Sequence, residues 1–232
     1  MVRMPGLDLR ADDVASQCET VRSKLQAWLS DEKEADPWEP KCEVVLHSDR
    51  SSYLKSVGQG GRLTVGSSAI RVAAGKVLQR GIDLLIEDGN KELYALPHEM
   101  VDVLLAARFP NTAPPRWAEE GLALLNDTDE KQERHRVDLR YAMQTGTTIP
   151  IQTLFVTTEY PSDWQRAVFY GESTSVVEYL TRIDTTEQFL RFVEMSMEVG
   201  HERALSRVYK IESPRDLERK WHQYALTSCS CR

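Results

Sequence analysis

The sequence predicts an α+β fold with its strands in the first half of the chain and its helices in the second. Short runs rich in β-formers at 42–47, 68–74 and 80–88 predict strands. From residue 96 onward, apolar residues recur mostly at helical spacing. The length of 232 residues allows one sizeable core or two small lobes.

Composition limits the classes of partner. The formal net charge is −7, which argues against a nucleic-acid backbone or an anionic membrane as the main partner. No run of 18 apolar residues is present, so no membrane span is expected. The N-terminus lacks the apolar core of a signal peptide. A cytoplasmic protein is therefore expected, or an extracytoplasmic one if a signal peptide has been removed.

Each part of the N-terminal half has its own pattern. Residues 1–10 are expected to be a flexible N-terminus, and 11–30 form an amphipathic helical pattern. An acidic, proline-bearing loop follows at 31–40. The runs 68–74 and 80–88, broken near a glycine, predict an antiparallel part of a small sheet.

The stretch 96–126 holds two apolar helical segments that carry an unusual concentration of metal-binding and acid–base groups. His98 and Asp102 are four residues apart, so both side chains lie on one helix face. Glu99 is next to that face, within reach of a water on a shared ion. Zinc hydrolases commonly use three protein ligands, a water and a carboxylate base. Glu120 on the second segment is the candidate for the third ligand.

The motifs P-H-E-M-V-D and P-R-W-A-E-E-G-L-A resemble the gluzincin metallopeptidases, in particular the peptidase MA-like domain. That family's pattern is H-E-x-x-H on one helix and P-x-W-x-x-E-G-x-A on the next. The F-Y-G-E-S run at 169–173 and the 204–221 segment are also similar to the family's C-terminal helices. The resemblance implies a zinc site with His98, Asp102 and Glu120 as ligands and Glu99 as general base.

The resemblance also implies a zincin-like architecture. A small mixed sheet is expected to pack on the motif helix, followed by an all-helical C-terminal lobe. A peptide or protein substrate would lie in the cleft between lobes, beside an edge strand expected at 80–88. The implied boundaries are one domain over 11–226, divided into an α/β lobe (11–95), motif helices (96–126) and a helical lobe (127–226), with a tail at 227–232.

In the helical lobe, 128–143 is predicted to be a charged surface helix and 147–160 an irregular segment. Further helices are predicted at 162–183, 186–199, 201–209 and 213–226.

Asp102 stands where the family pattern has its second histidine. Asp is shorter than His, and a further carboxylate ligand adds negative charge, so zinc affinity and catalysis should both be weakened or lost. Asp102 can alternatively hydrogen-bond the His98 ring. Three functions therefore stay open: a zinc metallopeptidase, an inactive pseudopeptidase that binds a peptide or protein, and a purely structural domain.

Residues outside the main motif receive smaller roles. Gluzincins often use a C-terminal donor to stabilise the oxyanion, and Tyr170 is the candidate here, with Arg166 as a lesser one. Trp117 is assigned to core packing between the two motif helices and Glu119 to solvent. The other histidines lack a partner at ligand spacing, so surface or core roles are expected for His47, His135, His201 and His222.

Cys18 falls on the first predicted helix and Cys42 at the start of the first predicted strand. In an oxidising compartment these two residues are candidates for a disulfide. The alternative is two buried free thiols, which are common in protein cores.

Overall fold

The computed structural model describes residues 1–4, 9–30, 38–86 and 93–230. The chain divides into two compact units, unit 1 (Met1–Ala113) and unit 2 (Pro114–Arg232). The boundary falls between the two motif segments, so each segment belongs to a different unit. Several predicted features lie outside the described residues: most of the acidic loop (31–37), the end of the third strand run (87–88) and the last residues of the tail (231–232).

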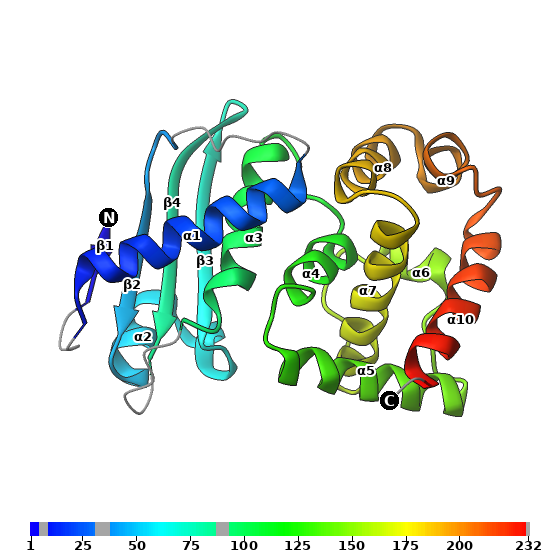
Figure 1. Cartoon of the computed structure of the whole chain (residues 1–232), viewed down its shortest axis with the longest axis horizontal. Helices are drawn as coiled ribbons and strands as arrows, with labels where there is room; N and C mark the ends of the chain where they lie inside the picture. The colour runs from blue at the N-terminus through cyan, green and yellow to red at the C-terminus, as the bar shows by residue number, and fades with distance from the viewer. Residues whose placement is uncertain (5–8, 31–37, 87–92, 231–232) are drawn as a thin grey trace. The chain divides into compact units, whose positions relative to one another are not determined.

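Unit 1 contains a four-stranded mixed sheet in the order β1-β2-β4-β3 (Figure 1). Strand β2 is parallel to both β1 and β4, and β3 is antiparallel to β4. The sheet therefore confirms the predicted α+β class and its mixed character. The strands are β1 (Val2–Arg3), β2 (Cys42–His47), β3 (Gly66–Ala73) and β4 (Lys76–Leu85).

One face of this sheet is apolar and holds the core of unit 1. Val44 and Leu46 of β2 lie opposite Ile82 and Leu84 of β4, and all four are at most 3% exposed. Their spacing of two residues places them on the same face. Helix α3 (Leu96–Arg108) packs against β3, β4 and the first helix, α1 (Ala11–Leu29). The predicted packing of the sheet on the motif helix is thus confirmed.

The prediction of an edge strand at 80–88 is wrong. Strand β4 lies inside the sheet between β2 and β3, and β3 is at the edge. Leu84, Leu85 and Ile86 are consecutive and all buried, a pattern typical of a central strand covered on both faces. The predicted antiparallel pairing itself is confirmed, because β3 pairs antiparallel with β4. Ala74 and Gly75, between the two strands, have the positive φ values of a tight hairpin turn.

The N-terminus takes part in the sheet. Val2 and Arg3 form β1 and pair with Val44 and Val45 of β2. No strand was expected within the segment 1–10. Between β2 and β3 the chain forms a short helix, α2 (Arg50–Val57), and a 3₁₀ turn, η1 (Gln59–Leu63).

The described part of unit 2 contains helices and no strand, as predicted for the C-terminal lobe. One helix was missed inside the segment expected to be irregular: α6 begins after Pro150, and Ile151, Leu154 and Phe155 are buried on one face. The helices are α4 (Arg116–Leu124), α5 (Asp129–Thr145), α6 (Ile151–Val156), α7 (Asp163–Ile183), α8 (Thr186–Val199), α9 (His201–Tyr209) and α10 (Pro214–Ser230).

The core of unit 2 surrounds Trp117, which is fully buried. Its predicted place in a core is confirmed, and its partners shown here lie on α6 and α8, whereas packing between the two motif helices stays a prediction. Its ring lies 4.6 Å from that of Phe155 and 5.8 Å from that of Phe189, measured between centroids. Helix α4 approaches α7 closely because Gly121 has no side chain: a Cβ there would lie 2.5 Å from the carbonyl oxygen of Ser173. No helix among the described residues of either unit has the length and apolar character needed to cross a membrane.

Candidate functional site

Helix α3 places the first group of candidate residues. Pro97 occupies the first turn, where its missing N–H would have no helical partner in any case. Glu99 is 8% exposed, while His98 and Asp102 are partly exposed. The core side of the helix is formed by residues such as Met100, Val101 and Val103.

Glu99 lies against the backbone of the edge strand β3. A Cβ built on Gly66 would lie 2.6 Å from Glu99 Oε1 and 2.8 Å from Ala95 Cβ. The missing side chain of Gly66 therefore creates the space that the Glu99 carboxylate occupies. The position of the predicted general base depends on this strand as well as on its own helix.

Asp102 also faces β3. The Ser68 hydroxyl donates a hydrogen bond of 3.0 Å to Asp102 Oδ2. Glu99 and Asp102 are three residues apart and share one side of the helix. Asp102 consequently links α3 to the edge strand, a role that the sequence did not reveal.

Helix α4 carries two adjacent glutamates in different environments. Glu119 forms an ion pair of 2.9 Å with Arg116 and is partly exposed. Glu120 is buried, with 8% exposure. Adjacent helix positions point about 100° apart, which explains the difference. The inward position of Glu120 is the orientation expected of the candidate ligand.

Tyr160 is the residue that the sequence analysis missed. Its hydroxyl donates a hydrogen bond to Glu120 Oε1. Its ring centroid lies 5.0 Å from the Arg116 guanidinium carbon and 6.2 Å from the Tyr170 ring centroid. Burial, followed by the charge of Glu120, raises the pKa of Tyr160, so the phenol keeps its proton. The only sequence signal was an aromatic residue in the polar segment between α6 and α7.

Tyr170, the predicted oxyanion donor, lies in the same cluster of unit 2. Burial and then the negative charge of Glu120 raise its pKa, which keeps its hydroxyl protonated as a donor requires. Arg166, the lesser candidate, acts in the opposite direction on this pKa. The structure thus brings Tyr160 and Tyr170 into one cluster with Glu120, although both lie 40 or more positions after it in the chain.

The other histidines have local partners, in agreement with the surface or core roles expected of them. His47 Nε2 lies 2.6 Å from Asp83 Oδ1 inside unit 1. In unit 2, His201 stacks on Phe155 with 4.8 Å between ring centroids. His135 lies edge-on to Tyr170, and His222 lies edge-on to Trp221.

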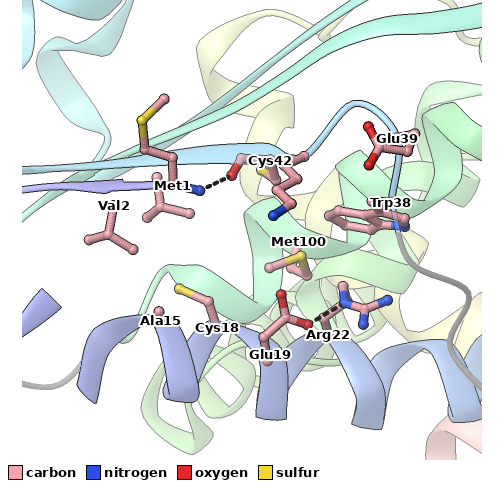
Figure 2. Close-up of a pocket in the computed structure, with 12 residues that line it drawn as sticks. Met1, Val2, Ala15, Cys18, Glu19, Arg22, Trp38, Glu39, Cys42 and Met100 are labelled. Carbon is pink, nitrogen blue, oxygen red and sulfur yellow. Dashed lines mark hydrogen bonds and ion pairs between the residues drawn. The ribbon is translucent and has the colours of Figure 1, made fainter. Parts of the chain in front are cut away.

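A separate pocket of about 350 Å³ lies in unit 1 between α1 and β2, and both cysteines line it (Figure 2). Cys18 and Cys42 are free thiols in this structure, Cys18 buried and Cys42 half-buried. Burial raises the pKa of each to about 11. Met100 also lines this pocket and lies nearly opposite His98 and Asp102 around α3, so the pocket is distinct from the predicted metal site.

No model of a known protein family and no curated protein sequence matches this chain. Within each unit, no group of three or more His, Cys, Asp or Glu side chains among the described residues is arranged to hold a metal ion. His98 and Asp102 belong to unit 1 and Glu120 to unit 2. Their convergence on one ion stays a prediction.

The donor groups are chemically suited to zinc. An imidazole and carboxylates are ordinary zinc ligands. Ligating carboxylates in proteins usually receive a hydrogen bond from a second residue, and Glu120 receives one from Tyr160. Asp102 is the less favourable member, because it is shorter than the histidine of the family pattern and adds a negative charge to the ligand set.

Proposed function

We propose that this protein is a gluzincin-like zinc metallopeptidase with an altered metal site. The observation that carries the proposal is the environment of Glu120: of two adjacent glutamates on α4, it is the buried one, held by a phenol. The family pattern assigns the ligand role to that glutamate. On α3, His98 and the buried Glu99 stand at the positions of first ligand and base.

In this proposal each residue has a defined role. His98, Asp102 and Glu120 hold the ion, which when bound makes water a better nucleophile and polarises a peptide carbonyl. Glu99 accepts the proton of the attacking water on a carboxylate oxygen and passes it to the leaving amine. Gly66 supports this role because it leaves the Glu99 carboxylate room beside β3.

Tyr170 is proposed to donate a hydrogen bond to the oxyanion that develops on the carbonyl. Its ring lies beside that of Tyr160, which hydrogen-bonds the proposed ligand Glu120. The substrate proposed is an extended peptide or an unfolded protein segment.

The alternative function is a pseudopeptidase that binds a peptide or protein without cleaving it. Asp102 favours this alternative, because it stands where the family pattern has a histidine. It is shorter than a histidine, adds a negative charge to the ligand set and links the edge strand to α3 through Ser68. In this case the motif helices would persist as structural and binding elements.

Metal content distinguishes the two functions. The protein purified from zinc-supplemented cells should contain zinc in a one-to-one ratio by elemental analysis, and Glu120→Gln should lose it. Glu119→Gln is the matched control, because it removes the same charge from the adjacent, ion-paired position. Glu99→Gln should keep zinc and lose cleavage of a quenched fluorescent casein. Zinc-free protein that cleaves nothing would favour the pseudopeptidase.

A further inference from the structure

We infer that Tyr160 is a positioning residue for Glu120. Its hydroxyl holds Oε1 and so fixes the orientation in which the Glu120 carboxylate would meet the metal ion. This inference rests on the proposed function, because it takes Glu120 as a metal ligand. It goes further by naming a residue that neither the family pattern nor the motif spacing indicated.

The geometry of the phenol supports this role. Tyr160 lies in the segment between α6 and α7, and its hydroxyl reaches the buried carboxylate on α4. A glutamate side chain has three rotatable bonds, so a carboxylate used as a ligand must be held in one orientation. A phenol that donates to one oxygen restricts the rotation of the carboxylate and so fixes its orientation.

The ring of Tyr160 is itself held from two sides. The Arg116 guanidinium carbon lies 5.0 Å from the ring centroid, within the range of a cation–π contact. The rings of Phe169 and Tyr170 on α7 lie edge-on, at 6.5 Å and 6.2 Å between centroids. Arg116 in turn pairs with Glu119. The hydroxyl is therefore directed by contacts from both α4 and α7.

A general anchoring role for Tyr160 predicts a different outcome. The residue is 44% exposed, so little of the unit 2 core depends on it. Replacing it with phenylalanine removes only the hydroxyl and keeps the ring in its contacts. If Tyr160 positions Glu120, this replacement changes the metal affinity and the ligand geometry. If Tyr160 only anchors the fold, the replacement lowers the stability of the metal-free protein.

The test compares Tyr160→Phe with the native protein and with Tyr170→Phe, each in the full chain and again in an Asp102→His background. Zinc affinity is measured by competition with a chromophoric chelator. Cobalt(II) is used as a second probe, because its visible absorption reports ligand number and geometry. Metal-free thermal unfolding shows whether the fold is retained.

We expect Tyr160→Phe to weaken zinc binding by about 10–100-fold, the usual effect of losing a residue that orients a ligand. The cobalt spectrum should change with it, while metal-free unfolding stays as in the native protein. Tyr170→Phe should keep the native zinc affinity, because it leaves the Tyr160–Glu120 hydrogen bond in place.

Two results would overturn the inference in distinguishable ways. If zinc binds and Tyr160→Phe binds it equally well with the same cobalt spectrum, the positioning role is wrong and the proposed function stands. If neither the native protein nor Asp102→His binds zinc or cobalt, the proposed function fails and the inference fails with it.

Discussion

The Ser68 hydroxyl lies 3.0 Å from Asp102 Oδ2 and links the edge strand to the motif helix. A histidine at position 102 would replace this carboxylate with an imidazole. The same residue that departs from the metallopeptidase pattern is therefore one that now contributes to packing within unit 1. This dual position makes Asp102 the most informative residue to change.

Asp102→His should raise zinc affinity. The imidazole restores a nitrogen ligand and removes a negative charge, which makes a bound water more acidic. Overpacking costs about 1–3 kcal/mol, and the lost Ser68 bond costs about 1 kcal/mol. One good ligand should exceed these costs. Calorimetric titration with zinc of both proteins measures the difference, with Ser68→Ala as control for the lost bond.

If Asp102→His binds zinc no better than the native protein, position 102 has been rebuilt for another purpose. The pseudopeptidase, which binds a peptide or protein without cleaving it, would then replace the proposed peptidase.

Gly66→Ala should displace Glu99 and destabilise unit 1. Its Cβ would lie 2.6 Å from Glu99 Oε1 and 2.8 Å from Ala95 Cβ, closer than a Cβ atom comes to its non-bonded neighbours. We expect a loss of about 1–3 kcal/mol in the free energy of unfolding, measured by urea denaturation. Gly81→Ala on β4 is the matched control, because its Cβ meets only Ala69 O at 3.6 Å. Equal stability of the two variants would contradict the described position of Glu99.

Glu172→Gln should remove a pH dependence of stability. Glu172 on α7 is fully buried, and both of its carboxylate oxygens accept the Ile149 N–H. Burial raises its pKa from 4.5 to about 8, and the backbone hydrogen bond from Ile149 opposes this rise. A pKa higher in the folded state means that stability is full below about pH 4.5 and falls as pH rises toward 8.

Urea unfolding of both proteins across this range provides the measurement. Glutamine stays neutral and can still accept the Ile149 N–H through its carbonyl oxygen. The variant should be the more stable protein above about pH 8, by about 1–3 kcal/mol, and close to the native protein near pH 4. A native protein whose stability does not fall through this range would show that Glu172 ionises without cost.

Cys18 and Cys42 should react slowly with thiol reagents. A pKa of about 11 leaves almost no thiolate at neutral pH, and the thiolate is the reactive form. In a Cys229→Ser/Cys231→Ser background, labelling by iodoacetamide at about pH 7 should be far slower than that of free cysteine. Denaturant should restore the rate. If the protein is isolated from an oxidising compartment and the two cysteines stay unlabelled even after denaturation, they form the disulfide instead.

Local patterns in the sequence were sufficient for most of the elements. Apolar spacing marked α1, α3 and the helices of unit 2 other than α6, and the β-formers around Gly75 marked the hairpin of β3 and β4. The same spacing placed Glu99 beside His98 and showed that only one of Glu119 and Glu120 can face inward. These features depend on helix and strand periodicity, which is a property of the chain within a few residues.

Tertiary structure decided what these residues contact. Whether β4 is an edge or a central strand depends on its pairing with β2, whose residues lie 38 positions before their partners in β4. Hydrophobicity alone does not select this neighbour. The bonds from Ser68 to Asp102 and from Tyr160 to Glu120 join residues 34 and 40 positions apart, and no local pattern encodes such pairs. The sequence by itself determined which groups are available for chemistry, because residue type and periodicity are local. Only the fold determined which partner orients each of them, because hydrogen bonds form between whichever groups packing brings within reach.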